Sequence, residues 1–479
     1  MDSCDPQDDE VCLRGECVRG CAVAAKSQSY LGCEFWSVDL PQFHDLPPNH
    51  PDEAPHAVVI ANTGDRPALV TIETRSGAVV PRPVNVPPGD TRTVPFPRLD
   101  VDGTGRTLNS FRLTTTEPVI AYQFNPLNNV NVHSNDASLL LPSNAIGQEY
   151  LVMSWPGGVP LDMLGMGAQT AWFTIVATAP GTTNLRLTFS CDIIDGGEFE
   201  GISQGDSLDV EMEQWEVLNF EAQTDLMGAL RGEVGDVTGS RVQSDQPVVV
   251  FAGHKEAVIG EDGEDGSNCC ADHLEQQMFP VPAWGQRYLA VHSPPRGTEP
   301  DYWRVLASEA DTVLTTVPVI DGLHGRTLGA GEFVEANTRE SFEITATHPI
   351  LVGQFLASQA SAGVETLTGD PAFLLAVPVE QFRSEYGALT PESYARDYVS
   401  VIKPAAAVVD LDGRELPADD FTPFGTGDWV FLHVEVEPGT HILTSRDDEP
   451  FAVNMYGYDG AVSYGYPGGL DLRRDDDRQ

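Results

Sequence analysis

Histidines, carboxylates and two cysteines gather near the middle of this sequence, in a combination that could bind a metal ion. The first histidine ends an apolar run within residues 248–256, and the second follows a cysteine pair within residues 269–275, so the two could be close in space. Imidazole and carboxylate groups together are ligands for transition metals. The sequence therefore predicts a candidate metal site formed by His254, Glu256, Asp272 and His273. Because no HxxxH or HExxH spacing is present, the alternative is that both histidines are hydrogen-bonded scaffold residues.

The loop between these two segments is strongly acidic. It contains four carboxylates, together with glycines that allow tight turns, and such a loop suits Ca²⁺, which binds oxygen ligands. The candidate ligands are Glu261, Asp262, Glu264 and Asp265. Their spacing differs from that of an EF-hand, so a solvated acidic loop is the alternative. Apart from these two metal hypotheses we assign no cofactor.

One short motif matches the nucleophile elbow of serine hydrolases. Gly201, Ser203 and Gly205 fit G-x-S-x-G, but such an elbow lies between a strand and a helix. Residues 207–217 instead alternate between polar and apolar side chains, as a strand does. We therefore predict that the protein is not an enzyme. The alternative is a metal- or carbohydrate-binding domain, or a hydrolase, centred on the two histidines and Asp272.

The cysteine spacing indicates disulfide bonds. Five of the eight cysteines fall within the first 33 residues, a segment too short to build a core without cross-links. A zinc site would need close C-x2-C pairs, which this segment lacks. Adjacent cysteines seldom bond to each other, so we expect Cys191 to be the partner of one cysteine of the central pair. The candidate disulfide cysteines are Cys4, Cys12, Cys17, Cys21, Cys33, Cys191, Cys269 and Cys270.

Disulfide bonds imply an oxidising compartment. We therefore expect an extracellular or cell-surface protein. No signal peptide precedes Cys4, so we expect a secreted, mature chain from which the signal peptide has been removed.

Charge and composition exclude several classes of partner. The 479 residues include 72 Asp and Glu against 27 Lys and Arg, which gives a net charge of −45. Such a chain repels polyanions, so nucleic acid and anionic membrane surfaces are poor partners. No apolar run approaches the ~18 residues of a membrane-spanning helix, and we expect no membrane insertion. With 45 Gly and 36 Pro the chain is interrupted too often for long helices, which favours a β-rich fold.

One pattern of strands recurs four times. An opening strand is followed by a turn, an alternating strand and a short apolar strand that we expect to start with a proline, where the missing N–H lies outside the ladder. The four prolines are Pro118, Pro247, Pro349 and Pro450. Several short strands in about 100 residues are typical of a β-sandwich. Seven tryptophans, mostly in or near these strands, are expected to lie in the cores.

The fold prediction is therefore all-β, with about four tandem β-sandwich modules after a short Cys-rich N-terminal segment. Residues 378–396 are the best candidate for a helix of one or two turns. A propeller is disfavoured, because its blades repeat at roughly 40–50 residues. The expected bounds are 1–35 for the disulfide-stapled segment, 36–155 for the first module, 156–295 for the second with its acidic Cys/His loop, 296–390 for the third, 391–472 for the fourth and 473–479 for a disordered tail.

Several stretches resemble the IgGFc-binding protein N-terminal domain family. They are DVTGSRVQSDQPVVVFAGH at 236–254, CCADHLEQQMFPV at 269–281 and the leader YLGCEFW at 30–36. AYQFNP at 121–126 with SNDASLLLP at 134–142, and YGY at 456–458 with SYGYPGG at 463–469, are similar to the bacterial branch of that family. The resemblance implies a secreted or surface-displayed β-rich module used in adhesion or protein contact. It also implies a further cysteine shortly after residue 254, where this chain has Lys255 and Glu256.

From these features we predict a non-enzymatic extracellular or cell-surface module for protein binding and adhesion. Its expected partner is an extracellular protein or a component of a matrix or surface. A further alternative is a structural subunit of a surface filament, whose copies join by adding a strand to an exposed sheet edge.

Overall fold

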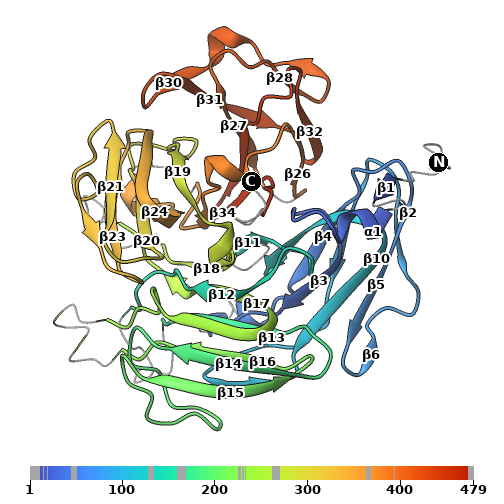
Figure 1. Ribbon diagram of the computed structural model, residues 1–479, viewed down its shortest axis with the longest axis vertical. Coiled ribbons are helices and arrows are strands. Elements are labelled where there is room, and N and C mark those ends of the chain that lie inside the picture. Colours follow the sequence, from blue (N-terminus) through green and yellow to red (C-terminus); the bar gives the residue numbers. More distant parts are fainter. Residues whose placement is uncertain are drawn as a thin grey trace.

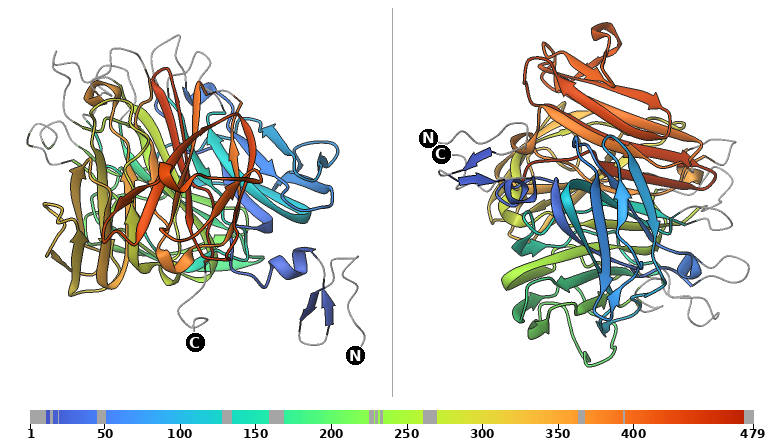
Figure 2. Two further views of the ribbon diagram at one scale, coloured as in Figure 1. Left: turned by 90° about the horizontal axis from the view of Figure 1, so that it is seen from above. Right: turned by 90° about the vertical axis from the view of Figure 1, so that its right-hand side faces the viewer.

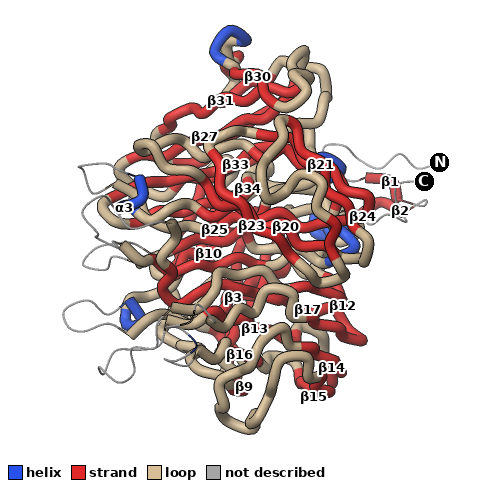
Figure 3. Tube along the Cα trace, turned by 90° about the vertical axis from the view of Figure 1, so that its left-hand side faces the viewer, coloured by secondary structure: helices blue, strands red, loops and turns tan. Residues whose placement is uncertain are grey.

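Strands make up nearly all of the regular structure, which confirms the predicted all-β class (Figure 3). The computed structural model describes residues 11–13, 16–18, 20–44, 51–127, 134–158, 169–224, 228, 231, 234–260, 270–362, 368–392 and 394–472. Within these residues no helix is long and apolar enough to cross a membrane. The helices with described bounds are short: α1 (Gly20–Ala24), α3 (Gln359–Ala362) and the 3-10 turns η2 (Pro51–Glu53), η4 (Val281–Ala283), η5 (Val379–Gln381) and η6 (Ala418–Asp420).

The strands form a short N-terminal hairpin and five antiparallel sheets. The hairpin is β1 (Val11–Leu13) with β2 (Glu16–Val18). The first sheet contains β3 (Gly32–Val38), β4 (Ala57–Ala61), β5 (Ala68–Thr74), β6 (Gly77–Ala78), β7 (Val84–Val86), β8 (Thr91–Pro95), β10 (Ser110–Asn125) and β11 (Asp136–Leu139). The second contains β9 (Gly105–Thr107), β12 (Gly147–Leu151), β13 (Ala171–Ala177), β14 (Thr182–Thr188), β15 (Ser207–Glu213), β16 (Val217–Glu221), β17 (Arg241–Ala257) and β18 (Asp272–Gln277).

The remaining strands form the third sheet and a fourth group made of two sheets. The third sheet contains β19 (Gly285–Ala290), β20 (Asp301–Ala307), β21 (Thr312–Val317), β22 (Thr327–Leu328), β23 (Phe333–Thr338), β24 (Phe342–Phe355) and β25 (Phe373–Leu375). In the fourth group, one sheet contains β26 (Glu385–Thr390), β28 (Val409–Leu411), β29 (Arg414–Glu415) and β32 (Gly439–Ser445). The other contains β27 (Arg396–Pro404), β30 (Thr422–Phe424), β31 (Trp429–Val436), β33 (Ala452–Asp459) and β34 (Val462–Pro467).

The first three sheets share one order of strands. The order β5-β10-β4-β8 in the first sheet recurs as β14-β17-β13-β16 and as β21-β24-β20-β23. The long strand of each sheet also pairs with an earlier and a later strand, namely β3 and β11, β12 and β18, or β19 and β25. In the fourth group two strands take the place of the long strand: β32 pairs with β26 and β28, and β33 pairs with β27 and β34. The number of modules and their bounds stay predictions. The strands β12, β19 and β26 belong to the second sheet, the third sheet and the fourth group, respectively.

Three of the four repeated prolines lie inside long strands rather than at strand starts, which corrects the sequence prediction for them. Pro118, Pro247 and Pro349 fall within β10, β17 and β24. Around each of them the long strand shifts register against its earlier partner, which is β3, β12 or β19. Proline has no N–H to give to a ladder, and a bulge is a place where a sheet tolerates it. In the fourth group the strand is interrupted, and Pro450 lies between β32 and β33.

The sheets are arranged around a common centre (Figure 1). Four strands, β11, β18, β25 and β34, lie against one another there. The first sheet and the fourth group are neighbours (Figure 2). Residues 28–30 and 470–472 connect them. The N–H of Tyr30 donates to the carbonyl of Leu470 at 3.1 Å, and the N–H of Leu472 donates to that of Gln28 at 2.6 Å. The ring of strands is closed by these contacts.

One hydrophobic core runs through all the groups, from Tyr30 to Leu472, and a smaller cluster fills the third sheet. Most of the tryptophans lie in these cores as predicted, and the fully buried ones are Trp36, Trp172, Trp284 and Trp303. Of the one or two helical turns predicted within residues 378–396, the structure has a single 3-10 turn. That segment contains the 3-10 turn η5 and then β26, because Tyr386 and Ala388 are buried in the core while β26 pairs with β32.

Candidate functional site

The centre of the ring, here called the central junction and made of β11, β18, β25 and β34, is tied together by one carboxylate. Asp136 on β11 accepts hydrogen bonds from the N–H of Glu275 on β18 and from the N–H of Phe373 on β25, both at 3.1 Å. The N–H of its neighbour Ala137 is 2.8 Å away, and the N–H of Gly465 on β34 is a further donor. All four central strands therefore donate to the same side chain.

The side chain of Gln276 on β18 makes the complementary set of bonds. Its Nε2 donates to the carbonyl oxygens of Ala137 at 2.7 Å, Phe373 at 2.6 Å and Gly465 at 3.1 Å. These acceptors belong to the other three central strands. Backbone groups in the interior must be paired, and Asp136 and Gln276 pair them where no ladder can.

The two histidines of the predicted metal group lie on neighbouring strands in the interior. His254 on β17 is 1% exposed, and His273 on β18 is fully buried. The Nδ1 of His254 accepts a hydrogen bond from the N–H of Glu256 at 3.0 Å, and His273 stacks on Trp172 with ring centroids 5.9 Å apart. Burial lowers the pKa of both imidazoles to about 3. Both are therefore neutral at physiological pH.

A glycine allows these two strands to approach. A Cβ atom on Gly253 would overlap the carbonyl oxygen of Leu274 on β18 and come within 2.7 Å of the Trp172 ring. Gly253 pairs with Glu275 in the β17–β18 ladder. The A-G-H stretch that carried the family resemblance is thus explained by packing.

Two carboxylates of the predicted transition-metal site have other hydrogen-bond partners in the described structure. Asp272 is buried, and its Oδ1 accepts from the N–H of Asn135 at 2.6 Å. Glu256 accepts from the Nε2 of Gln169 at 3.1 Å. Among the described residues no three His, Cys, Asp or Glu side chains are placed to hold a metal ion. The described structure thus shows separate partners for Asp272 and Glu256, and the metal hypothesis for His254, Glu256, Asp272 and His273 stays a prediction.

The acidic loop lies outside the described residues. This applies to Glu261, Asp262, Glu264 and Asp265, and the Ca²⁺ hypothesis for them stays a prediction. The G-x-S-x-G match is followed directly by β15, as the sequence indicated, so Ser203 has no helix behind it.

A serine, a histidine and an aspartate that the sequence reasoning missed lie together in the first sheet. The Oγ of Ser37 is 3.3 Å from the Nε2 of His56, and the Nδ1 of His56 is 3.7 Å from Asp39. Ser37 donates its own proton to the Oε1 of Gln123 at 2.6 Å, and both Ser37 and His56 are fully buried. A substrate has no access to this hydroxyl. Gln123 in turn donates to Glu275 at 3.1 Å, so the group extends the polar interior of the central junction.

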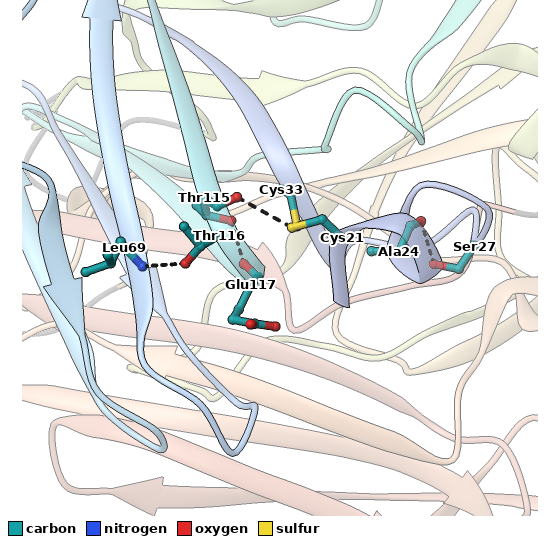
Figure 4. The surroundings of a disulfide bond; sticks show 8 residues. All are labelled: Cys21, Ala24, Ser27, Cys33, Leu69, Thr115, Thr116 and Glu117. Carbon is teal, nitrogen blue, oxygen red and sulfur yellow. Dashed lines mark hydrogen bonds between the residues drawn. A yellow bond between two sulfur atoms is a disulfide. The ribbon is translucent and has the colours of Figure 1, made fainter. Parts of the chain in front are cut away.

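A disulfide fastens the N-terminal helix to the first sheet (Figure 4). Cys21 on α1 is bonded to Cys33 on β3. Both are among the predicted disulfide cysteines. The Sγ of Cys21 also lies 3.5 Å from the carbonyl oxygen of Thr115 on β10. The side chains of Cys4, Cys12, Cys17 and Cys269 lie outside the described part of the chain.

The predicted role of Cys191 is wrong. Cys191 is a free thiol, whereas Cys270 is disulfide-bonded to a partner outside the described side chains. Cys191 lies beside Asp236, and burial raises the pKa of its thiol to about 12. Cys191 is partly buried against the core, and a thiol held in its neutral form is unreactive, since the thiolate is the reactive species.

Lys255, which stands where the family resemblance implied a cysteine, is a buried ion-pair residue. Its Nζ lies 2.9 Å from Glu221 and 2.5 Å from Asp102. Burial alone would lower the pKa of Lys255, but these two carboxylates raise it overall. The ion pair joins β17 to β16 and to the segment that connects the first two sheets.

Comparison with known proteins agrees with the sequence motifs. A family model described as IgGFc binding protein matches residues 136–457. The human IgGFc-binding protein is 25% identical over 347 residues, which cover 72% of this chain and 6% of that protein. The chain therefore spans only a small part of its human relative.

Two solved structures show weak similarity. A tetra-tandem repeat from the extending region of a large adhesion protein is 12% identical, with 86% of this chain and 94% of that chain covered and a TM-score of 0.08. Salmonella alpha-2-macroglobulin reacted with methylamine is 9% identical, with 92% and 33% covered and a TM-score of 0.13. Neither similarity carries an argument about this fold.

The matched range begins at Asp136 and includes Gln276, so the family motifs coincide with the residues that tie the central junction. Because the family model spans more than half of the chain, this protein belongs to the IgGFc-binding protein family.

Proposed function

We propose that this protein is a non-enzymatic module that binds another protein outside the cell or on its surface, in an adhesive role. The observation that carries the proposal is the family match over residues 136–457. The human relative is named for binding the Fc part of IgG, but this chain corresponds to a small part of it, so the partner is identified only by class, as an extracellular protein or a matrix or surface component.

The distribution of polar groups supports a binding surface rather than a buried reaction centre. The described histidines of the central group are neutral and enclosed, and the Ser37 hydroxyl is inaccessible. The net charge of −45 favours a partner with a basic or uncharged contact surface, because like charges across an interface are costly. The Cys21–Cys33 disulfide agrees with an oxidising location.

The experiment is capture of the partner with the folded full-length chain. The purified protein is immobilised, incubated with extracellular and cell-surface fractions at 50 and 300 mM NaCl, and the retained proteins are identified by mass spectrometry. A matched control bait carries Asp136→Ala, which removes the acceptor shared by the central strands while changing the net charge by only one. One protein that the native chain retains saturably at both salt concentrations, and that the control does not retain, supports the proposal. Retention by both baits, or only at low salt, means charge-driven adsorption and contradicts it.

A filament subunit is a second candidate, favoured by an open sheet edge. The third sheet ends at β23, which pairs only with β20 among the described strands. Strand addition to such an edge would join copies of the chain. Light scattering at increasing protein concentration tests it, and a monomer at all concentrations contradicts it.

A further inference from the structure

The central junction buries four carboxyl groups close to one another. They are Asp136 on β11, Asp272 and Glu275 on β18, and Asp370 just before β25, and each is 0% exposed. Figure 1 places β11, β18 and β34 together in the middle of the ring, so these groups lie where all the sheets meet.

Two oxygens of this cluster lack a partner among the described residues. The Oδ1 of Asp272 accepts from the N–H of Asn135 at 2.6 Å, and the Oδ1 of Asp370 accepts from the N–H of Gln359 at 3.2 Å. The Oδ2 of Asp272 and the Oε1 of Glu275 are buried without a hydrogen bond among the described residues, and Asp370 has the backbone of Cys270 as a second partner. An ionised carboxylate in such a place is strongly disfavoured, whereas a neutral carboxylic acid fits it.

The surroundings supply little positive charge. Arg296 is the cation beside Asp370, and its guanidinium is also paired with Glu299 at 3.3 Å. His254 and His273 are neutral. The other titratable groups that face the cluster are acidic: Asp370 and Asp136 face Asp272, Glu256 faces Asp370, Asp39 and Asp136 face Glu275, and the phenol of Tyr394 lies near Asp272.

We propose that the central junction is a pH-sensitive lock: its buried carboxyl groups are accommodated in their neutral form, and their ionisation loosens the junction as the pH rises above neutral. Burial raises the pKa of Asp370 to about 7 and holds the pKa values of Asp272 and Glu275 well above their usual range. The folded chain thus retains protons that the unfolded chain has released above pH ~4. Stability is therefore lost as the pH rises through the folded-state pKa values.

The test is the melting temperature of the full chain between pH 6.5 and pH 8.5 at constant ionic strength. We expect a fall of roughly 5 °C for the wild type. Asp272→Asn and Asp370→Asn keep the accepting oxygen and remove the ionisation, so each should flatten the slope. Asp209→Asn is the matched control, because the Asp209 side chain is 75% exposed, and it should keep the wild-type slope. Equal slopes in all four proteins, or a wild-type melting temperature that is constant or rises with pH, would overturn the proposal.

A measurement on the wild type keeps the proposal testable if a variant fails to fold. Hydrogen exchange, corrected for the intrinsic effect of pH, is compared between the central strands β18 and β25 and the outer strands β14 and β15. We expect protection of the central strands to fall several-fold more than that of the outer strands from pH 6.5 to pH 8.5. An equal change in both sets contradicts the lock.

Discussion

The hydroxyl of Tyr150 donates a hydrogen bond to the carbonyl oxygen of Val248, the residue that follows Pro247, at 2.8 Å. The same hydroxyl accepts from the N–H of Gly147 at 2.7 Å. Tyr288 makes the equivalent pair of bonds in the third sheet and Tyr386 makes it in the fourth group. In each case a tyrosine on β12, β19 or β26 donates to the backbone carbonyl of the residue after the proline.

Tyr150→Phe tests this arrangement. The substitution leaves the carbonyl of Val248 and the N–H of Gly147 buried without a partner, and we expect it to lower the free energy of unfolding by about 1–2 kcal/mol. Urea denaturation measures the change. Tyr398→Phe is the control, because among the described residues the Tyr398 hydroxyl makes no hydrogen bond and the ring is only partly buried. Equal effects of the two substitutions would show that the hydroxyl of Tyr150 contributes nothing.

The sequence carries this tyrosine at a fixed place in the repeat. G-Q-E-Y at 147–150, G-Q-R-Y at 285–288 and R-S-E-Y at 383–386 precede the second, third and fourth prolines in the same order, and G-C-E-F at 32–35 precedes the first. The prolines alone predicted strands but placed the strand start wrongly in the first three sheets. A strand can continue past a proline only if another group satisfies the backbone, and in the second and third sheets the tyrosine is that group.

The central junction could not be predicted in the same way. Strand periodicity shows which face of a strand is buried but not which distant strand it meets. Asp136 and Gln276 are 140 residues apart along the numbering, and no local pattern connects them to Phe373 or Gly465. The histidines therefore looked like metal ligands, although both lie in the packed interior. The free Cys191 was missed for the same reason, because pairing depends on distance in space.

Gln276→Met should weaken the central junction without changing its shape. Methionine has a similar length but donates no hydrogen bond, so the carbonyls of Ala137, Phe373 and Gly465 lose a buried donor. We expect a loss of roughly 2–4 kcal/mol in the free energy of unfolding. Gln148→Met is the matched control, since the Gln148 amide donates to the carbonyl of Asp245 at an exposed position. If Gln148→Met destabilises the protein as much as Gln276→Met, the buried bonds of Gln276 contribute no more to stability than an exposed one.

Removing the Cys21–Cys33 disulfide should loosen the closure of the ring. The bond spans a sequence separation of 12, and the loop-closure model assigns it about 3 kcal/mol. The double substitution Cys21→Ala with Cys33→Ala is expected to lower the melting temperature and to raise hydrogen exchange at residues 28–31 and 470–472. Cys191→Ala removes a free thiol instead and should leave exchange at both segments unchanged. Unchanged exchange in the double variant would mean that the disulfide does not support the closure.

The two buried histidines lower the free energy of unfolding in acid. The pKa values of His254 and His273 are about 3 in the folded chain, against ~6.5 in the unfolded chain. The unfolded chain therefore binds more protons as the pH falls below about 6.5, and stability is lost progressively towards pH 3, opposite in sign to the carboxyl groups of the junction. Because the carboxyl groups act in the opposite sense over the same range, we expect the effect in the difference between proteins: His273→Gln should gain melting temperature relative to the wild type as the pH falls from 6 to 4, since it removes one such group. His348→Gln, at a partly exposed position, serves as the comparison. An acid slope that is identical in wild type, His273→Gln and His348→Gln would show that the burial of His273 does not control the acid response.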